Sequence, residues 1–383
     1  MKELLTNPNN ETEKVYVPRR PELLDTFRHE SGKRIIQPYL SDPSEPYSLR
    51  LRATEKAGTL KFDTTLKSAG EIVADGKSRD EYTAVVSESR FGYYTTDELP
   101  TVYKKRVSPL DKIDIDFFDD GDAWIESEDP AAWNLFLDRH GLSDSDFEDM
   151  TGRVPDNETR AHELYRRMHE GRSAFRPYQP FDVDLALEGI LQATTKHSRS
   201  RLPVVRLYGR SGSGKSRYLS DLRKGLEAHN VPSAVISTDD YNIGTTALTR
   251  INGGEHPTNF DTADVYDLGA AWADALRWLH GIPIVERKFD FATSEPKYGE
   301  QLAAPADGTV LFIEGLWARH PNFDAADVSY DVATPLATSL GQRITRDTKD
   351  RPEFADPSKN LAYYLEHAEP AYRAQGRITP EVQ

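Results

Sequence analysis

Residues 209–216 have the residue types and spacing of a loop that binds phosphate groups. The stretch reads GRSGSGKS and matches the pattern GxxxxGK[ST] at every fixed position. Such a loop points backbone N–H groups into a concavity at a helix N-terminus, where the helix dipole also favours a polyphosphate. Lys215 is expected to reach the outer phosphates and Ser216 to bind Mg²⁺. The expected nucleotide contacts are Gly209, Ser211, Gly212, Ser213, Gly214, Lys215, Ser216 and Arg217.

The segments around this loop are expected to place it between a strand and a helix. Residues 202–208 are rich in β-branched and apolar types, and leucines at 219, 222 and 226 recur at helical spacing. Further buried strands are expected at 233–237, 282–285 and 309–313, and a helix at 264–279. Alternating strands and helices indicate an α/β fold with a parallel sheet, whose ligands bind at the carboxyl ends of the strands.

Two acidic residues follow the ends of predicted strands. Asp239 comes just after the strand at 233–237, and Glu314 follows the apolar run at 309–313. A carboxylate at the tip of such a strand, beside a phosphate-binding loop, is typical of a group that acts on Mg²⁺ or its water shell. Taken alone, Glu314 would be an ordinary loop acid; together with residues 209–216 it is a candidate Mg²⁺ ligand.

The second half of the chain resembles the uridine kinase and phosphoribulokinase group of P-loop kinases across most of residues 200–375. Besides the loop, the matching stretches are Asp239–Tyr241, 259–267, 290–293, 312–315 and 343–347. The resemblance implies ATP as phosphoryl donor and Asp239 as the general base that accepts a proton from an acceptor hydroxyl. It also implies that Arg343 and Arg346 are lid cations; the alternative is an ordinary solvated helix face.

One departure from that group lies on the acceptor side. Uridine kinases carry a His and an Arg that help to recognise the nucleoside, and the corresponding positions here are Ser294 and Pro296. A site that reads a base through hydrogen bonds discriminates poorly without those donors. Nucleoside specificity therefore does not follow from the resemblance.

The first half consists of short alternating segments separated by turn residues, at 47–53, 59–67, 79–86, 101–107, 112–118 and 123–128. Because side chains two apart share a face of a strand, Arg50 and Arg52 project together, as do Lys104 and Arg106. One interpretation is an antiparallel sheet with a solvated charged face. The other is a closed barrel whose charged side chains line the lumen, with cations for a polyphosphate and carboxylates for a divalent metal.

Residues 1–170 also resemble the CYTH family, the triphosphate tunnel metalloenzymes. The resemblance is carried by the ordered stretches 11–14, 47–52, 65–67, 79–82, 103–106, 114–117, 126–128 and 149–153. It implies an eight-stranded antiparallel tunnel. The implied triphosphate-binding residues are Arg50, Arg52, Lys67, Arg79, Lys104 or Lys105, and Arg106, and the implied metal ligands are Glu11, Glu13, Glu126 and Glu128.

The opening motif departs from the family pattern. The family begins with ExExK, whereas here the lysine is Lys14 and the position two beyond Glu13 is Val15. By the two-residue period of a strand, Lys14 is expected to point away from the lumen. This departure argues against substrate binding or turnover in this half, and a degenerate phosphate-binding module is the alternative.

Length, charge and composition limit the classes of function that this chain can have. A chain of 383 residues is expected to form two domains, and we expect 1–170 as the tunnel, 171–201 as a linker with a lead-in helix, and 202–383 as the kinase. The formal charge of −15 argues against a general nucleic-acid-binding surface. The absence of cysteine excludes disulfides and thiolate metal sites. With no apolar run of membrane-spanning length, we expect a cytoplasmic protein.

The sequence therefore predicts a multidomain protein: an antiparallel β-barrel followed by an α/β kinase. The expected partners are ATP and a small hydroxyl-bearing acceptor in the kinase half, and tripolyphosphate or a nucleoside triphosphate in the tunnel. Mg²⁺ is the expected cofactor, with Mn²⁺ as an alternative in the tunnel. Two other functions stay open: a triphosphatase with a regulatory P-loop domain, and a non-catalytic sensor of nucleotide or polyphosphate. Homo-oligomerisation stays open too.

Overall fold

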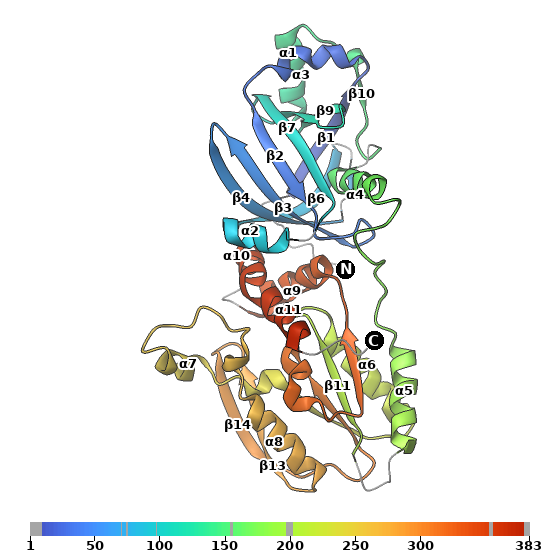
Figure 1. Cartoon of the computed structure of the whole chain (residues 1–383), viewed down its shortest axis with the longest axis vertical. Helices are drawn as coiled ribbons and strands as arrows, with labels where there is room; N and C mark the ends of the chain where they lie inside the picture. Colours follow the sequence, from blue (N-terminus) through green and yellow to red (C-terminus); the bar gives the residue numbers. More distant parts are fainter. Residues whose placement is uncertain are drawn as a thin grey trace. The chain divides into compact units, whose positions relative to one another are not determined.

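The chain divides into two compact units, Met1–Tyr178 and Gln179–Gln383. The computed structural model, drawn in Figure 1, describes residues 10–69, 71–73, 76–96, 98–153, 156–196, 202–351 and 355–378. None of the helices in these ranges is long and apolar enough to cross a bilayer.

The first unit is built on an antiparallel sheet. Its strands are β1 (Asn10–Pro18), β2 (Lys33–Pro38), β3 (Tyr47–Lys56), β4 (Thr59–Ser68), β5 (Glu71–Val73), β6 (Gly76–Val85), β7 (Thr101–Leu110), β8 (Ile113–Phe118), β9 (Ala123–Ser127) and β10 (Phe147–Asp149). The order is β10-β1-β9-β8-β7-β2-β3-β4-β6-β5, and β1 also pairs with β6. Strand β1 pairs with β6 through Asn10–Glu13 and with β9 through Lys14–Tyr16.

Helices cover parts of this sheet. They are α1 (Asp25–Arg28), α2 (Glu88–Tyr94), α3 (Pro130–His140) and α4 (Asn157–Met168). Helix α3 begins at the N-cap Asp129, which accepts a hydrogen bond from the Ala131 N–H, and ends at Gly141 in the left-handed conformation. Its Trp133 and Phe136 pack in a buried cluster with Ile115 of β8. Apolar residues of β8 thus face α3, and the alternate positions face the opposite side of the sheet.

That opposite side carries the charged residues, and it is not solvated. Arg50 is 8 % exposed, Lys67 is 7 % exposed and Lys104 is 3 % exposed. On β3, the residues on either side of Arg50, Leu49 and Leu51, are also fully buried. Both faces of this part of the sheet are therefore buried, which contradicts the interpretation of a solvated charged face.

The second unit is an α/β structure, as the alternation of elements predicts. Strands β12 (Ser233–Ser237), β15 (Val310–Glu314), β11 (Val204–Gly209) and β16 (Val328–Val332) form a parallel sheet in that order. The helices are α5 (Val183–Lys196), α6 (Lys215–Ala228), α7 (Thr245–Ile251), α8 (Leu268–Leu279), α9 (Leu336–Asp350), α10 (Pro357–Tyr363) and α11 (Glu369–Ile378). A 3₁₀ turn, η3 (Thr238–Tyr241), follows β12.

The strand expected at 282–285 is not part of the parallel sheet. Strand β13 (Ile284–Asp290) instead pairs antiparallel with β14 (Glu295–Leu302) as a separate two-stranded ribbon. Of the β13 residues only Ile284 is buried, so the short apolar run marks the anchored end of a hairpin rather than a central strand. The fourth strand of the sheet is β16, which we did not predict. It is only partly buried, and two of its five residues are polar, so it lacks the apolar run of the other strands.

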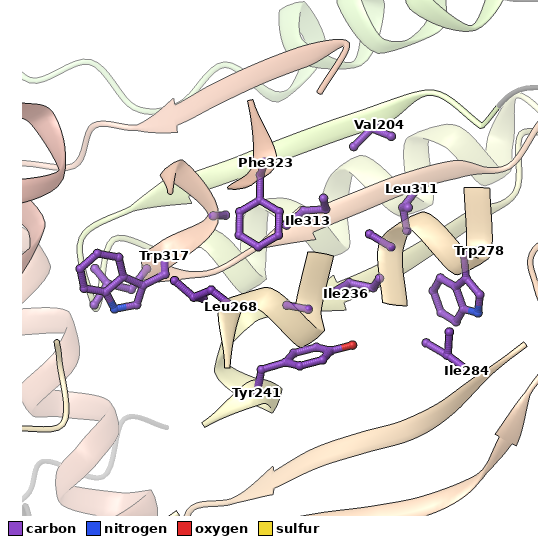
Figure 2. Packing of buried hydrophobic residues seen from close by; sticks show 14 residues of the cluster. Val204, Ile236, Tyr241, Leu268, Trp278, Ile284, Leu311, Ile313, Trp317 and Phe323 are labelled. Atoms are coloured by element: carbon purple, nitrogen blue, oxygen red, sulfur yellow. The ribbon is translucent and has the colours of Figure 1, made fainter. Parts of the chain in front are cut away.

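Buried side chains pack on both faces of the parallel sheet. On one face, Leu268 and Trp278 of α8 pack in a cluster with Ile236 of the edge strand β12 and Ile313 of the central strand β15. Figure 2 shows this layer, with Trp278 beside Ile284 at one end. On the other face, Ile190 of α5 joins a cluster with α6 and β11. The predicted linker at 171–201 therefore contains a helix that belongs to the core of the second unit.

Candidate functional site

The second unit contains a cavity of about 370 Å³ at the carboxyl ends of its strands, here called the P-loop cavity. Many residues expected from sequence line it together. They are Ser211, Gly212, Gly214, Lys215, Ser216, Arg217, Asp239, Glu314, Arg343 and Arg346. Two expected residues are not part of the wall: Gly209 ends β11, and Ser213 is buried within the loop.

Glycines allow the loop to pass close to α9. Gly212 has a φ of +81°, and a Cβ atom there would lie 2.2 Å from the carbonyl oxygen of Ser339. Gly214, with a φ of +91°, is the N-cap of α6. Since side-chain-bearing residues rarely adopt this conformation and no space exists for a Cβ at Gly212, the spacing of glycines in the motif follows from backbone packing.

Lys215 is held by the loop itself. Its ammonium donates hydrogen bonds to the carbonyl oxygens of Gly209 at 3.0 Å and Arg210 at 2.8 Å. Burial lowers the pKa of Lys215, although the carboxylates of Asp239 and Glu314 act in the opposite direction. These bonds position a cation where the outer phosphates of a nucleotide would bind.

Asp239 and Glu314 meet because β12 and β15 are hydrogen-bonded neighbours. Ser237, the last residue of β12, is in register with Glu314 and donates a hydrogen bond to its Oε1 atom at 2.7 Å. Burial raises the pKa values of both carboxyl groups. Gly315, which follows Glu314, has a φ of +133°, and a Cβ there would lie 2.0 Å from Thr238 Oγ1. The close approach of the two strand ends thus depends on this glycine.

The donor atoms of this cavity fit Mg²⁺. Ser216 and Glu314 offer a hydroxyl and a carboxylate, which are the hard oxygen ligands that Mg²⁺ prefers. Across the described ranges, no group of three or more His, Asp or Glu side chains forms a ready-made metal site. Mg²⁺ usually needs only one or two carboxylates when substrate phosphates supply further ligands, so the two findings agree.

Asp347 holds three arginines of this cavity, and we did not identify it as a site residue from sequence. Its side chain is fully buried and accepts hydrogen bonds from Arg343 at 3.2 Å and Arg346 at 2.7 Å. Arg351, the C-cap residue of α9, lies 3.5 Å away. The arginine–aspartate spacings of four residues along α9 were a usable signal, because such residues share a helix face. Arg343 is buried, so it does not belong to a solvated helix face; Arg346 is partly exposed.

Five aromatic side chains form part of the cavity wall. They are Phe260, Tyr266, Phe289, Phe291 and Tyr363. Of the two positions that depart from uridine kinases, Ser294 lines the cavity and has a φ of +54°, whereas Pro296 is not in the wall. The guanidinium of Arg351 lies 4.0 Å from the ring centre of Phe291. The wall around Ser294 therefore contains aromatic rings and Arg351, and positions 294 and 296 themselves carry neither the His nor the Arg of uridine kinases.

A second cavity, of about 170 Å³, lies on the charged side of the first unit's sheet and is here called the charged cavity. Its wall includes many residues expected from sequence: Arg50, Arg52, Lys67, Arg79, Arg106, Glu13, Glu126 and Glu128. Lys104 is buried outside the wall, where it donates to Asp116 at 2.5 Å. The side chain of Glu11 lies outside the described residues.

Ion pairs neutralise much of the charge in this cavity. Arg79 bonds Glu13 at 2.7 Å and Arg106 bonds Glu126 at 2.5 Å. Lys67 pairs with Glu81, a residue that we missed although it lies two positions from Arg79 on β6. Burial alone would raise the pKa of Glu126, but Arg106, Lys104 and Lys67 lower it. Two of the four expected metal ligands, Glu13 and Glu126, therefore form ion pairs with arginines.

Strand β1 has the side-chain alternation that its sequence predicts. Glu13 and Val15 line the charged cavity. Lys14 lies instead 3.8 Å from Asp149 of β10 and is not in the cavity wall. The shifted lysine therefore leaves the wall with an apolar side chain at this position.

Comparison with known proteins identifies the second unit's family. Residues 204–362, which contain most of the P-loop cavity wall, match the model of the Phosphoribulokinase / Uridine kinase family. This stretch is a P-loop domain of that family. A uridine kinase of Staphylococcus epidermidis is 29% identical over 150 residues, which cover 39% of this chain and 70% of that protein.

Two solved structures show weaker similarity. D-glycerate 3-kinase from Cryptococcus neoformans is 15% identical, with a TM-score of 0.41, over 52% of this chain and 90% of that one. The inorganic triphosphatase NE1496 is 20% identical, with a TM-score of 0.26, over 39% and 92%. Both scores lie below 0.5, so they establish neither a shared fold nor a shared activity.

The Asp347 network of the kinase-family domain yields a stability prediction. Asp347→Asn removes one of the two carboxylates that compensate buried Arg343, the other being Asp261, and breaking a buried ion pair in this way costs about 3–5 kcal/mol. We expect the free energy of unfolding of the second unit to fall by that amount in a urea titration read by pulsed hydrogen exchange in β11 and α6. The control is Asp221→Asn, which breaks an exposed pair with Lys224 and should cost less than about 1 kcal/mol. Equal effects of both substitutions would contradict the prediction.

Glu158, on α4, gives the first unit a predicted dependence on pH. It lines the charged cavity, accepts a hydrogen bond from Ser41, and has a pKa raised by burial from 4.5 to about 7. Between these values the unfolded chain ionises Glu158 while the folded unit keeps it protonated, so stability falls as the pH rises from 4.5 to 7 and is level above 7. A shift of this size corresponds to about 3 kcal/mol.

The matching variant is Glu158→Gln, which retains an oxygen that accepts from Ser41. We expect it to remove this pH dependence and to be more stable than the unmodified protein at pH 8, by up to about 3 kcal/mol, with the gap narrowing at pH 5. Urea titrations read by pulsed hydrogen exchange in β7, β8 and β9 measure both proteins. A gap that is the same at both pH values would show that Glu158 does not titrate in this range.

Proposed function

We propose that the kinase-family domain transfers the γ-phosphoryl group of ATP to a hydroxyl group of a small molecule. The observation that carries this proposal is that Lys215, Asp239 and Glu314 line one cavity at the carboxyl ends of the parallel strands. Phosphoryl transfer needs in-line positioning, neutralisation of charge and one correctly placed base, and these side chains supply the last two.

The proposed reaction assigns one role to each group. The loop 209–216 binds the phosphates, and Asp239 accepts the proton of the acceptor hydroxyl. The acceptor oxygen then bonds to the γ-phosphorus while the bond from that phosphorus to the bridging β–γ oxygen breaks, which releases ADP. Bound at Ser216 and Glu314, Mg²⁺ would neutralise negative charge on the phosphates. The raised pKa of Asp239 makes it a stronger base than an exposed aspartate, in keeping with this role.

The arginines of α9 stabilise charge in this proposal. Arg343 and Arg346 line the cavity and are oriented by Asp347. Fixed donors of this kind lower the barrier most when they need not reorganise during the reaction. The aromatic wall near Ser294 would exclude water from the acceptor side, which limits hydrolysis of ATP.

Asp239→Asn tests the proposed base. We expect kcat to fall by about 10²–10⁴-fold while ATP binding is retained, measured as ADP release in Mg²⁺ with a panel of nucleosides, sugars and glycerate as acceptors. The control is Asp240→Asn, because the Asp240 side chain bonds Lys288 and the backbone of Phe289 and is not in the cavity wall. An Asp239→Asn variant with the kcat of the unmodified protein would refute this role.

We also propose that the first unit binds a triphosphate in the charged cavity. Its wall carries five cationic side chains, those of Arg50, Arg52, Lys67, Arg79 and Arg106. The pairings of β1 with both β9 and β6 support a tunnel formed by the ring of strands. The proposal concerns binding of a triphosphate only, and it assigns no hydrolytic step to the charged cavity.

Lys67→Met separates this binding from that of the kinase-family domain. Loss of a charged donor from a buried site is expected to weaken tripolyphosphate binding by about 10–100-fold, measured by calorimetry at pH 7. Burial lowers the pKa of Lys67 to about 8, so the affinity should also fall as the pH rises above 8. Lys215→Ala should leave tripolyphosphate binding to the first unit unchanged. The opposite result for the two variants would place the binding site in the second unit.

A further inference from the structure

A third cavity, of about 510 Å³, continues the charged side of the first unit's sheet, and we call it the basic mouth. It shares Arg52 and Arg106 with the charged cavity. Its other lining residues include Lys33 of β2, Lys56 of β3 and Lys61 of β4. Two cavities that share wall residues provide a continuous charged surface along the strands.

The basic mouth has more positive than negative charge. Five of its lining residues are cationic, and two, Asp63 and Asp114, are acidic. Arg106 is already bonded by Asp114, Asp116 and Glu126. In the described part of the chain, no ion pair is found for Lys33, Lys56 or Lys61. The unbalanced cations therefore belong to the mouth rather than to internal pairs.

Arg52 links the two cavities, and its charge is only partly compensated by Asp63, which lies opposite it on β4, and by Glu81. Its buried Nε atom has no hydrogen-bond partner among the described residues. The neighbouring Arg50 guanidinium, together with burial, lowers the pKa of Arg52 to about 10. Like charges repel strongly at low solvent exposure. An anion placed between the cavities would both satisfy this donor and offset that repulsion.

The composition of the mouth favours phosphate groups over the organic part of a nucleotide. Of its lining residues, none is aromatic and Ile35 is apolar. The hydroxyls of Thr54 and Thr59 and the lysine ammonium groups are donors to phosphate oxygens. A nucleobase would instead be expected to stack on an aromatic ring.

The spacing along β3 extends this surface well beyond one triphosphate. Arg50, Arg52, Thr54 and Lys56 alternate along the strand and line one or both cavities. Alternate residues of a strand are about 7 Å apart, so Arg50 to Lys56 spans about 20 Å. We propose that the basic mouth binds the additional phosphates of a linear polyphosphate longer than triphosphate. The inference rests on the proposed binding of triphosphate in the charged cavity.

The test compares tripolyphosphate with long-chain linear polyphosphate by calorimetry on the full chain. The variant Lys56→Ser/Lys61→Ser changes two exposed lysines of the mouth. The control, Arg34→Ser/Arg139→Ser, makes the same change in net charge at exposed positions that line neither cavity. We expect the mouth variant to weaken long-chain binding by about tenfold and to leave tripolyphosphate binding unchanged. The control should affect neither ligand.

Each other outcome has a distinct meaning. If long-chain polyphosphate binds no more tightly than tripolyphosphate, the basic mouth is not a polyphosphate site. The same conclusion follows if the mouth variant and the control variant weaken the binding of long-chain polyphosphate equally. If polyglutamate or RNA of similar charge competes as well as polyphosphate, the mouth lacks the proposed phosphate specificity and the inference is wrong. If binding of long-chain polyphosphate depends on the mouth lysines but tripolyphosphate does not bind, the proposed function of the charged cavity fails and the proposal for the basic mouth stands. If neither ligand binds, both proposals fail.

Discussion

Asp347 accepts hydrogen bonds from Arg343 and Arg346 although its own side chain is fully buried. A carboxylate without water is costly unless it is paired, and the same holds for a buried guanidinium. Each charged group therefore offsets the free-energy cost of burying the other. The arrangement orients cations toward the cavity in which Lys215, Asp239 and Glu314 also lie. Charge compensation in the protein interior is thus the condition under which this cavity can exist.

The first unit meets the same requirement with a different architecture. Lys104, Arg106 and Asp116 form a buried group on neighbouring strands β7 and β8. Alternate residues of β8, such as Ile115, pack against Trp133 and Phe136 of α3. One face of the sheet is therefore stabilised by apolar packing and the other by ion pairs. Where pairing is incomplete, as at Arg52, a buried donor is left without a hydrogen-bond partner among the described residues.

Much of the site chemistry could be predicted because it depends on short-range spacing. The GxxxxGK[ST] pattern, with a strand before it and a helix after it, places Lys215 and Ser216 without knowledge of distant residues. Asp239 and Glu314 could be predicted because each lies just after a short apolar run. The two-residue period of strands likewise placed Glu13 and Val15 on one face of β1 and Lys14 off it.

Other features could not be found in this way, because they depend on which segments meet in space. The ribbon of β13 and β14, the central role of Asp347 and the pairing of Lys67 with Glu81 each join residues whose local patterns leave several partners open. Whether the charged face of the first sheet was solvated or enclosed was also undecided, since the alternation of residue types is the same in both cases.

The sequence by itself determined the identity and order of the phosphate-binding elements, because backbone geometry ties glycine spacing, strand period and helix period to local residue type. Only the tertiary structure decided which charges are buried, which carboxylates form ion pairs with arginines, and how Arg52 connects two cavities. Burial and ion pairing depend on the distance between residues far apart in the chain, and local spacing carries no information about that distance.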